Sequence, residues 1–356
     1  MSKKHNFSAG PCILPQDVLK KASEAVLNFN NDNLSLIEIS HRSKPFVDVM
    51  KKAINLVKEL LEIPQGYSVL FLQGGASLEF LMAPLNLMKK ENGKAAYLNT
   101  GTWANKAIIE ANKFGEINII GDSSDKNYSY IPKGYSIPED IDYFHCTSNN
   151  TIFGTQMKVF PNVPSLMVCD MSSDIFSRRI DVSKFDLIYA GAQKNMGPAG
   201  TTLVIVKDDI LGNTGRDIPT MLDYKTHISK DSMFNTPPVF AVYVSMLTLK
   251  WLKDHGGVEW IEEVNNRKAE LIYSEIDKNP LFEGVAEKED RSNMNITFTL
   301  TDSSLEDKFN ILWQEVGISG IKGHRSVGGY RASIYNALPF ESVDVLVNVM
   351  RNLTKN

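Results

Sequence analysis

Hydrophobic positions fall into short apolar runs that alternate with amphipathic stretches along most of the chain. Tyr67–Leu72 and Ala95–Asn99 have the length and composition of buried strands, and each leads through a turn of small residues into a helical pattern, Leu78–Met88 and Trp103–Phe114. Apolar strands joined by helices predict a mainly parallel sheet with helices on both faces. The same pattern predicts strands at Ile117–Ile120, Tyr143–Cys146, Leu166–Cys169, Leu187–Ala190 and Thr202–Val206.

The pattern changes toward the end of the chain. A long helical pattern begins near Ser245, and after Pro280 two strands, Asn295–Leu300 and Ala332–Tyr335, alternate with two amphipathic helices, Leu305–Val316 and Ser342–Leu353. This order is typical of a smaller α+β domain. Because 356 residues are many for one core, we predict a large domain over residues 16–260 and a small domain formed by residues 1–15 and 261–356.

Composition excludes several classes of protein. With 38 Lys and Arg against 42 Asp and Glu, the net charge of −4 argues against a nucleic-acid or membrane-surface binder, so any anion site must be local. Cys12, Cys146 and Cys169 form no CxxC pair, which predicts neither a metal site nor a disulfide framework, and the latter two resemble core residues. No signal peptide or spanning segment is apparent, so we expect a cytoplasmic protein with no membrane partner.

The segment Tyr189–Gly200, YAGAQKNMGPAG, places Lys194 between two apolar strands among small residues. Most lysines are solvated loop residues, and Lys194 taken alone fits that interpretation too. However, the glycines and alanines around it leave little to cover the side chain except a bound ligand. Schiff-base chemistry requires an amine whose charge is destabilised by its surroundings. Lys194 is therefore a candidate catalytic lysine.

Asp170 follows the apolar run that ends at Cys169. It could simply begin a turn. A carboxylate at the carboxyl end of a strand can also pair with a pyridinium nitrogen and keep it protonated, which makes that ring an electron sink. The turn Gly74–Ser77 lies between a strand and a helix, where backbone amides bind phosphate. It matches neither the Walker pattern nor GxGxxG, so nucleotide-binding interpretations lose their usual support.

Two further residues follow strand ends. Trp103 could stack on a flat ring, although a half-buried aromatic at a helix start is the commoner case. Thr151, just after Ser148-Asn149-Asn150, could donate a hydrogen bond to a phenolic oxygen, or it could belong to ordinary turn chemistry.

Taken together, these residues resemble the phosphoserine aminotransferases over nearly the whole chain. The motifs that carry the resemblance are Phe7–Pro11, His41-Arg42, Tyr189–Gly200, Phe234–Pro238, Lys322–Arg325 and Arg331–Ala337. The resemblance implies a fold-type I, aspartate-aminotransferase-like homodimer with a seven-stranded large-domain sheet and pyridoxal 5′-phosphate as cofactor. It also implies a reaction, in which glutamate and 3-phosphohydroxypyruvate give O-phosphoserine and 2-oxoglutarate in serine biosynthesis. In many bacteria such enzymes also act on 4-phosphohydroxythreonine in pyridoxine biosynthesis.

The resemblance also implies roles for single residues. Lys194 resembles the Schiff-base lysine, Asp170 the pyridinium partner, Trp103 the stacking ring and Thr151 the phenolic-oxygen contact. Ala76, Ser77 and Gln193 match positions of the phosphate cup, whereas Asn235 and Thr236 resemble a pair that reaches the cofactor phosphate of the other subunit. His41, Arg42, His324 and Arg325 form a positive cluster suited to the substrate's anionic groups, and Arg331 resembles the arginine that binds its α-carboxylate.

The sequence departs from the family pattern in two places. Many members carry an arginine after the glycine-rich turn, where this chain has Ala76 and Ser77, so one cation that faces phosphate is missing. Some members have serine in place of Ala9. Both changes bear on affinity and selectivity more than on the type of reaction.

Three alternatives stay open at this point. An alanine–glyoxylate or serine–pyruvate type aminotransferase would share the fold but would have little use for the paired His-Arg cations. A cysteine desulfurase needs a nucleophilic cysteine in a late loop, and no cysteine follows Cys169. A cofactor-binding protein without activity is disfavoured by the presence of Lys194, Asp170 and Arg331.

Overall fold

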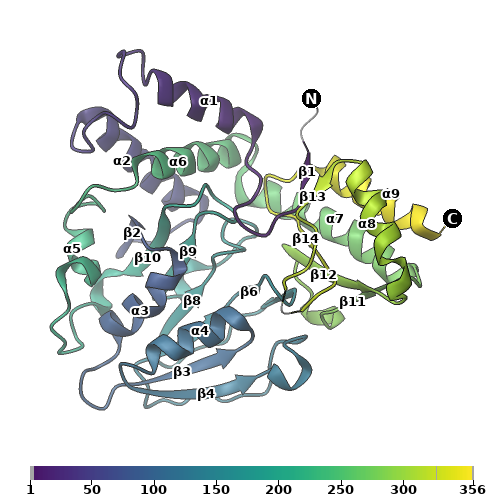
Figure 1. Cartoon of the computed structure of the whole chain (residues 1–356). Coiled ribbons are helices and arrows are strands. Elements are labelled where there is room, and N and C mark those ends of the chain that lie inside the picture. Colours follow the sequence, from purple (N-terminus) through teal and green to yellow (C-terminus); the bar gives the residue numbers. More distant parts are fainter. Residues whose placement is uncertain (1–3, 326, 355–356) are drawn as a thin grey trace.

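A seven-stranded sheet forms the centre of the larger part of the molecule (Figure 1). The computed structural model describes residues 4–325 and 327–354. Strand β10 is antiparallel to both of its neighbours, β9 and β2, and every other neighbouring pair is parallel. This confirms the predicted mainly parallel sheet. Its strands, in spatial order, are β2 (Tyr67–Leu72), β10 (Thr202–Lys207), β9 (Leu187–Gly191), β8 (Leu166–Asp170), β5 (Tyr143–Thr147), β3 (Lys94–Asn99) and β4 (Glu116–Asp122).

Helices cover both faces of this sheet. One face packs against α1 (Gln16–Leu27), α2 (Lys44–Leu60) and α6 (Val239–Asp254). The other packs against α3 (Gly75–Leu87), α4 (Thr102–Ala111) and α5 (Tyr224–Ile228). Burial on both sides explains why the central strands are apolar at successive positions rather than at alternate ones. Cys146 and Cys169, on neighbouring strands, are fully buried as predicted.

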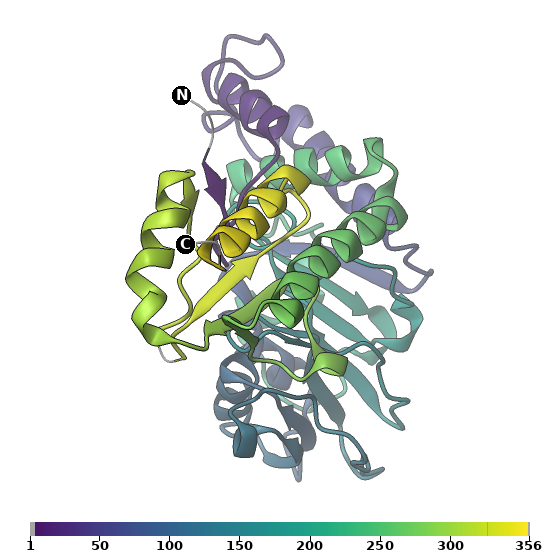
Figure 2. The ribbon, with the colours of Figure 1, turned by 90° about the vertical axis from the view of Figure 1, so that its right-hand side faces the viewer.

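A second, smaller layer lies beside the large sheet (Figure 2). Strands β11 (Phe282–Gly284), β12 (Asn295–Leu300) and β14 (Tyr330–Ser333) form an antiparallel sheet. It shares a core with α7 (Gly257–Lys278), α8 (Glu306–Glu315) and α9 (Phe340–Thr354). The N-terminal strand β1 (His5–Asn6) pairs in parallel with β13 (Ile318–Ser319), which attaches the start of the chain to this layer.

The predicted strand at Ala332–Tyr335 was displaced by two residues. The ladder of β14 with β12 runs from Tyr330 to Ser333. Ile334 and Tyr335 are buried, which is what the pattern indicates, but they lie beyond the ladder, in the segment that leads to the turn at Asn336. The backbone carbonyls of both accept hydrogen bonds from the buried amine of Lys268, which replaces the bonds of a sheet.

Helix α7 joins the two layers. Val258 and Ile261 pack in the core of the large sheet, whereas Ala269, Ile272 and Ile276 pack in the core of the smaller one. The predicted boundary at residue 260 stays a prediction. No helix within the described ranges is both long and apolar enough to span a bilayer. The shorter elements are β6 (Asn149–Asn150), β7 (Thr155–Gln156) and 3₁₀ turns at Ser124–Lys126, Val182–Lys184, Asp208–Ile210, Thr220–Leu222, Lys288–Asp290 and Ser303–Leu305.

Candidate active site

The candidate site lies where the parallel strands end. Asp170 is the last residue of β8, Thr151 comes shortly after β5, and Lys194 lies in the connection that follows β9. The carboxyl ends of parallel strands meet at one edge of a sheet, where ligands of such folds bind. Residues separated by more than forty positions in the sequence are therefore brought to one edge.

Lys194 is half-buried and makes no hydrogen bond or ion pair with any described residue. Its Nζ lies 5.2 Å from the centre of the Trp103 ring. Burial lowers the pKa of Lys194 below its usual value, and the Arg331 charge lowers it further, whereas the carboxylate of Asp170 raises it. The segment of the N-terminal arm at Gly10 packs closely over it, since a Cβ added there would lie 3.6 Å from Lys194 Cγ. The result is an amine that loses its proton readily.

The carboxylate of Asp170 is buried and lacks a cationic partner at ion-pair distance within the described residues. It accepts one hydrogen bond, from the backbone N–H of Ser172, at 2.9 Å. Burial raises its pKa, and the charge of Lys194 opposes that shift. Thr147, the register partner of Asp170 on β5, has a buried hydroxyl with no hydrogen-bond partner. A protonated ring nitrogen placed here would satisfy the carboxylate.

The glycine turn before α3 has the backbone of an anion site. Gly74 and Gly75 have φ values of +92° and +66°, which favour glycine, and no side chain caps the start of the helix. Ala76 is half-buried and Ser77 is exposed, so the first amides of the helix are accessible. Gln193, half-buried beside Lys194, holds the N-terminal arm through its carbonyl, which accepts the N–H of Cys12 at 3.0 Å. A phosphate at this turn would need no cation of its own.

Trp103, Thr151 and Arg331 form one wall of the site. Trp103 Nε1 donates to Thr151 Oγ1 at 3.1 Å, and Arg331 Nη1 donates to the Thr151 carbonyl at 3.1 Å. Since the Thr151 hydroxyl accepts from Trp103, its own hydrogen remains free to donate to a ligand. The Nε of Arg331 is buried without a partner, so its guanidinium keeps a donor for a carboxylate.

The wall continues into a group of cations. His324 and Arg325 lie in the loop between β13 and β14. Burial lowers the pKa of His324, and the charges of Arg331, Arg325 and Lys106 lower it further. Lys106 was not predicted from the sequence. The sequence feature that could have revealed it is its position three residues after Trp103 on α4, because this spacing places both side chains on one face of the helix.

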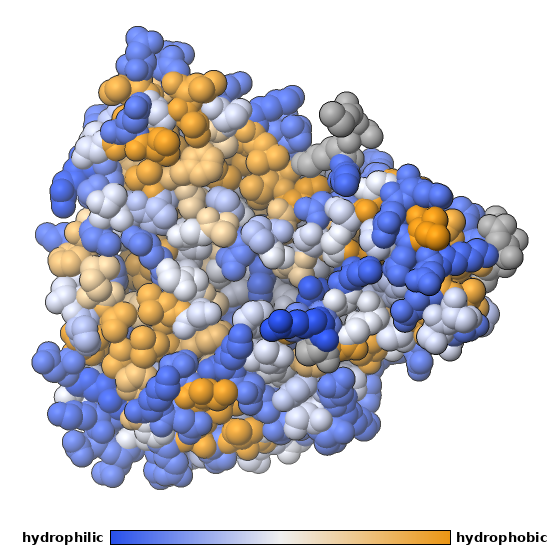
Figure 3. All heavy atoms as spheres, viewed as in Figure 1, coloured by the Kyte–Doolittle hydropathy of each residue, from blue (hydrophilic) through white to orange (hydrophobic). Residues whose placement is uncertain are grey.

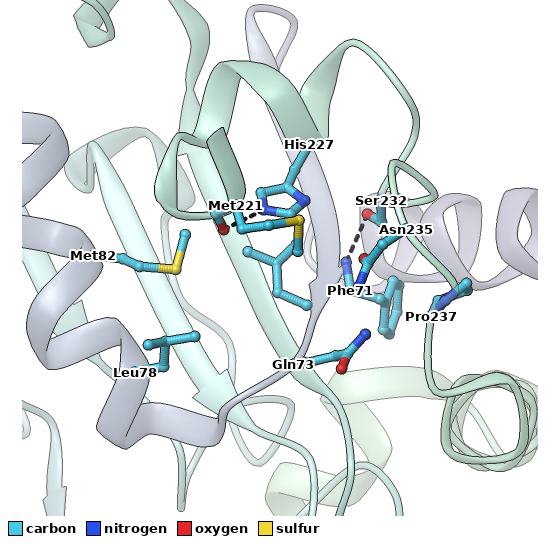
Figure 4. Close-up of a pocket in the computed structure, with 10 residues that line it drawn as sticks. Phe71, Gln73, Leu78, Met82, Met221, His227, Ser232, Asn235 and Pro237 are labelled. Atoms are coloured by element: carbon cyan, nitrogen blue, oxygen red, sulfur yellow. Dashed lines mark hydrogen bonds between the residues drawn. The ribbon is translucent and has the colours of Figure 1, made fainter. Parts of the chain in front are cut away.

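The other predicted residues lie apart from this wall within the same chain. His41 is buried and Arg42 exposed just before α2, and no interaction in the described part of the chain links either one to Lys194, Asp170 or Arg331. Asn235 lines a small pocket of about 40 Å³ beside Gln73 and Leu78 (Figure 4). Gln73, the residue just before the glycine turn, donates through its Nε2 to the Thr236 carbonyl at 3.0 Å.

A second residue that the sequence did not single out is Glu79. It is fully buried in the first turns of α3 and accepts a 2.6 Å hydrogen bond from the hydroxyl of Tyr224. Burial raises the pKa of Glu79 to about 8, and the nearby charge of Asp170 also raises it. The sequence could have indicated its burial, because Glu79 is a glutamate within the apolar run Leu78–Met82. This group therefore holds its proton more tightly than an ordinary glutamate, and the carboxylates whose charges act on Lys194 are those of Asp170 and Asp174.

The residues at the strand ends fit pyridoxal phosphate. The open turn at Gly74–Ser77 suits its phosphate, the Trp103 ring its pyridine ring, and the buried carboxylate of Asp170 its ring nitrogen. The Lys194 amine, without a bond of its own among the described residues, suits the aldehyde. The unpaired hydroxyl of Thr147 beside Asp170 supports the fit, because a buried polar atom normally has a partner.

Comparisons with known proteins agree with this arrangement. The aminotransferase class-V family profile matches residues 4–346. The chain is 67% identical, over 99% of both sequences, to a phosphoserine aminotransferase from Flavobacterium psychrophilum. It is similar in structure to a phosphoserine aminotransferase from Bacillus circulans subsp. alkalophilus, with a TM-score of 0.96, 42% identity and 99% of each chain covered. For a phosphoserine aminotransferase with bound PLP from Trichomonas vaginalis the TM-score is 0.92 and the identity 37%, with 98% and 100% covered.

Proposed function

This chain belongs to the class-V aminotransferase family and, within it, to the phosphoserine aminotransferases, and we propose that it exchanges the amino group of glutamate with 3-phosphohydroxypyruvate, giving O-phosphoserine and 2-oxoglutarate. The observation that carries the proposal is the position of Lys194, an amine with a lowered pKa that lies near the buried carboxylate of Asp170 and near a group of cations. The amine and Asp170 serve amino-group transfer, while the cations serve a substrate that is anionic at both ends. Action on 4-phosphohydroxythreonine and a cytoplasmic location stay predictions.

Pyridoxal phosphate is the cofactor that we assign to this site. The backbone amides at Ala76 and Ser77, with Gln193, would hold its phosphate, and Trp103 would cover its ring. Asp170 would accept the hydrogen bond of the ring nitrogen, and the free hydroxyl hydrogen of Thr151 would reach the phenolic oxygen. When bound, the cofactor supplies an aldehyde for the amino group and an electron-withdrawing ring that stabilises negative charge at the substrate's α-carbon.

Lys194 performs the proton transfer in this proposal. Its lowered pKa makes the amine lose its proton more readily than an ordinary lysine does, so it can take the proton from the α-carbon of glutamate in one half-reaction and deliver a proton to the α-carbon of the phosphorylated acid in the other. Arg331 orients the substrate by binding its carboxylate, because its Nε is unpaired and its Nη1 is fixed on Thr151. The charge of Lys194 and the hydrogen bond from Ser172 both oppose the rise that burial causes in the pKa of Asp170, and this favours a carboxylate next to the ring nitrogen.

We place His41, Arg42, Asn235 and Thr236 in the partner subunit's site of a homodimer. Several large apolar side chains are exposed around them, including Ile37 at 58%, Phe234 at 40% and Phe240 at 37%. Figure 3 shows hydrophobic residues gathered over α1 and α6 and over the region of α3 and α5. Two exposed aromatic residues on either side of Asn235 and Thr236 support an interface at this segment. His41 and Arg42 would then complete the partner's positive cluster.

The test follows the two half-reactions by visible absorption. Purified protein reconstituted with pyridoxal phosphate is expected to show a band that glutamate removes and 3-phosphohydroxypyruvate restores. Lys194→Ala is the control, and it should show neither the wild-type band nor turnover. If only an unphosphorylated keto acid restores the band, the assignment of an aminotransferase stands but the substrate is wrong. If wild-type protein gives no band at all, the proposed cofactor site is wrong.

A further inference from the structure

Lys106 lies on the same helix face as Trp103 and extends over its ring. Lys106 Nζ is 4.8 Å from the centre of the ring, and Lys194 Nζ is 5.2 Å from the same centre. The two amines are therefore separated by no more than the total of 4.8 and 5.2 Å, about 10 Å. A cation held over an indole ring is favourable but remains available to an anion. A three-carbon acid that reacts at Lys194 would bring its far end within reach of Lys106.

Neighbouring lysines on this side of the sheet are compensated, whereas Lys106 is not. Lys113 pairs with Glu110 at 2.7 Å, and Lys94 pairs with Asp140 at 2.9 Å. Glu110 is four residues after Lys106 and could pair with it, but Lys113 occupies that carboxylate. None of the ion pairs between described residues involves Lys106. An uncompensated cation at the mouth of a site is free to attract a charged ligand.

Several cations gather near the neighbouring histidine. Among the described residues, Arg331, Arg325 and Lys106 all lower the pKa of His324 by their positive charge. Arg331 is directed to Thr151 and retains a free Nε for a carboxylate. Arg325 and Lys106 therefore add positive charge beyond what one carboxylate bound at Arg331 requires. This surplus fits a ligand with a second, more highly charged group at its far end.

We propose that Lys106 is a specificity-determining residue that binds the phosphate of the phosphorylated keto acid, and this inference rests on the proposed function. Its amine lies within about 10 Å of the Lys194 amine and adds a cation on the wall that Trp103 forms. The glycine turn at Gly74–Ser77 carries no cationic side chain. Lys106 supplies positive charge from α4 instead of from α3, the helix that this turn begins. A dianionic phosphate gains more from this charge than a neutral hydroxyl does.

The experiment measures equilibrium binding to the holoenzyme without an amino donor, so that no transfer takes place. Calorimetry would compare 3-phosphohydroxypyruvate with hydroxypyruvate for wild type, Lys106→Met, Lys106→Arg and Lys184→Met. Lys184 is the matched control, because it is exposed and comes just before β9, at the amino ends of the parallel strands and away from the site. In Lys106→Met the dissociation constant of the phosphorylated acid should rise by about five-fold, and that of hydroxypyruvate by less than about two-fold.

Two further results belong to the expected outcome. Lys106→Arg should restore most of the preference, and the effect of Lys106→Met should shrink as ionic strength increases. If wild type prefers the phosphorylated acid and Lys106→Met keeps that preference in full, the role of Lys106 is wrong while the proposed function stands. Equal weakening of both acids, or the same loss in Lys184→Met, would also overturn it. A wild type that binds both acids equally would instead contradict the proposed substrate.

Discussion

At the scale of single residues, burial without a partner decides which groups can react. Lys194 and Asp170 both have pKa values displaced by burial, and each displacement is opposed by the charge of the other. The pair remains close enough to interact electrostatically but makes no ion pair at bonding distance within the described residues. A ligand placed between them can therefore use both charges. This explains why the two residues were recognisable from the sequence: each follows a strand end with small or apolar neighbours.

Glu79 gives a pH dependence that can be measured at this scale. Its pKa in the folded state is about 8, whereas an unfolded glutamate has a pKa of about 4.3. Between these values the folded protein binds more protons than the unfolded one, so stability falls as pH rises through that window. Replacing Glu79 by glutamine, which keeps the shape and stays neutral, should remove this contribution, which is about 1.4 kcal/mol per pH unit at most.

The measurement is denaturant unfolding of wild type and Glu79→Gln at several pH values from 5 to 9. The stability of the variant relative to wild type should increase with pH across this range. A matched control is Glu283→Gln, since Glu283 is exposed on β11. If Glu79→Gln and wild type show parallel curves, Glu79 titrates in the folded protein as it does in the unfolded one, and burial does not raise its pKa.

The sequence could not identify residues whose role depends on which elements pack together in the fold. Lys106 is one of many exposed lysines on amphipathic helices, and only its position over Trp103 distinguishes it. His41 and Arg42 were assigned to the positive cluster because they are cationic and match a family motif. The sequence does not give their distance from Lys194, which depends on how α2 packs. Pattern and composition report burial well, but they do not report which surfaces meet.

At the scale of elements, buried asparagines connect the two layers near the site. Asn336, just after β14, receives a hydrogen bond from Asn265 at 2.8 Å and donates to the Phe176 carbonyl at 2.9 Å. Its backbone N–H donates to Asn195, the residue after Lys194, at 2.9 Å. Phe176 has a φ of +60°, which is unfavourable for an aromatic residue, so this turn after Asp170 depends on its partners. The strand that carries Arg331 is thus fixed relative to both Lys194 and Asp170.

This arrangement predicts a coupled loss in Asn336→Ala. Removing the side chain leaves the Phe176 carbonyl without this donor and takes one acceptor from the Asn265 amide, which keeps only its bond to the Ser177 carbonyl, and this should cost about 2 to 4 kcal/mol of unfolding free energy. Since Arg331 lies five residues earlier on the same segment, the KM for glutamate should rise several-fold more than kcat falls. Denaturant unfolding and steady-state kinetics give the two readouts.

The control for this prediction is Asn266→Ala. Asn266 is the exposed neighbour of Asn265 on α7 and accepts a hydrogen bond from Asn293 at the surface, so its loss should stay within about 0.5 kcal/mol. A loss of stability in Asn336→Ala without any change in the KM for glutamate would mean that these hydrogen bonds hold the layers together but do not position Arg331.

Most elements were predicted correctly because the strands are buried on both faces and the helices on one. The orientation of β10 could not be predicted, since a doubly buried strand has the same apolar pattern whether it is parallel or antiparallel. The position of β14 was wrong because Ile334 and Tyr335 are as buried as strand residues while Lys268 satisfies their carbonyls from another helix. Hydrophobicity identifies core positions, and hydrogen bonding then decides which of them lie in a sheet.

At the scale of the whole molecule, one chain provides an incomplete positive cluster. Lys194, Asp170, Arg331 and His324 lie together, while His41 and Arg42 lie before α2 without an interaction to that group in the described part of the chain. Exposed apolar residues such as Phe234 and Phe240 border the segment of Asn235 and Thr236. A homodimer in which each subunit lends these residues to the other would bury the apolar surface and complete both sites.

Mixed dimers distinguish this arrangement from a site built by one chain. Subunits with Lys194→Ala and subunits with Arg42→Ala, carrying different tags, are unfolded, refolded together and purified as the mixed dimer. If Arg42 acts in the partner's site, one site of the mixed dimer carries both lesions and the other carries none, so activity should be about half that of the wild-type dimer. If Arg42 acts in its own chain, both sites are damaged and activity should not exceed that of the Arg42→Ala homodimer. The two arrangements contain the same residues, so the difference reports only which subunit supplies Arg42.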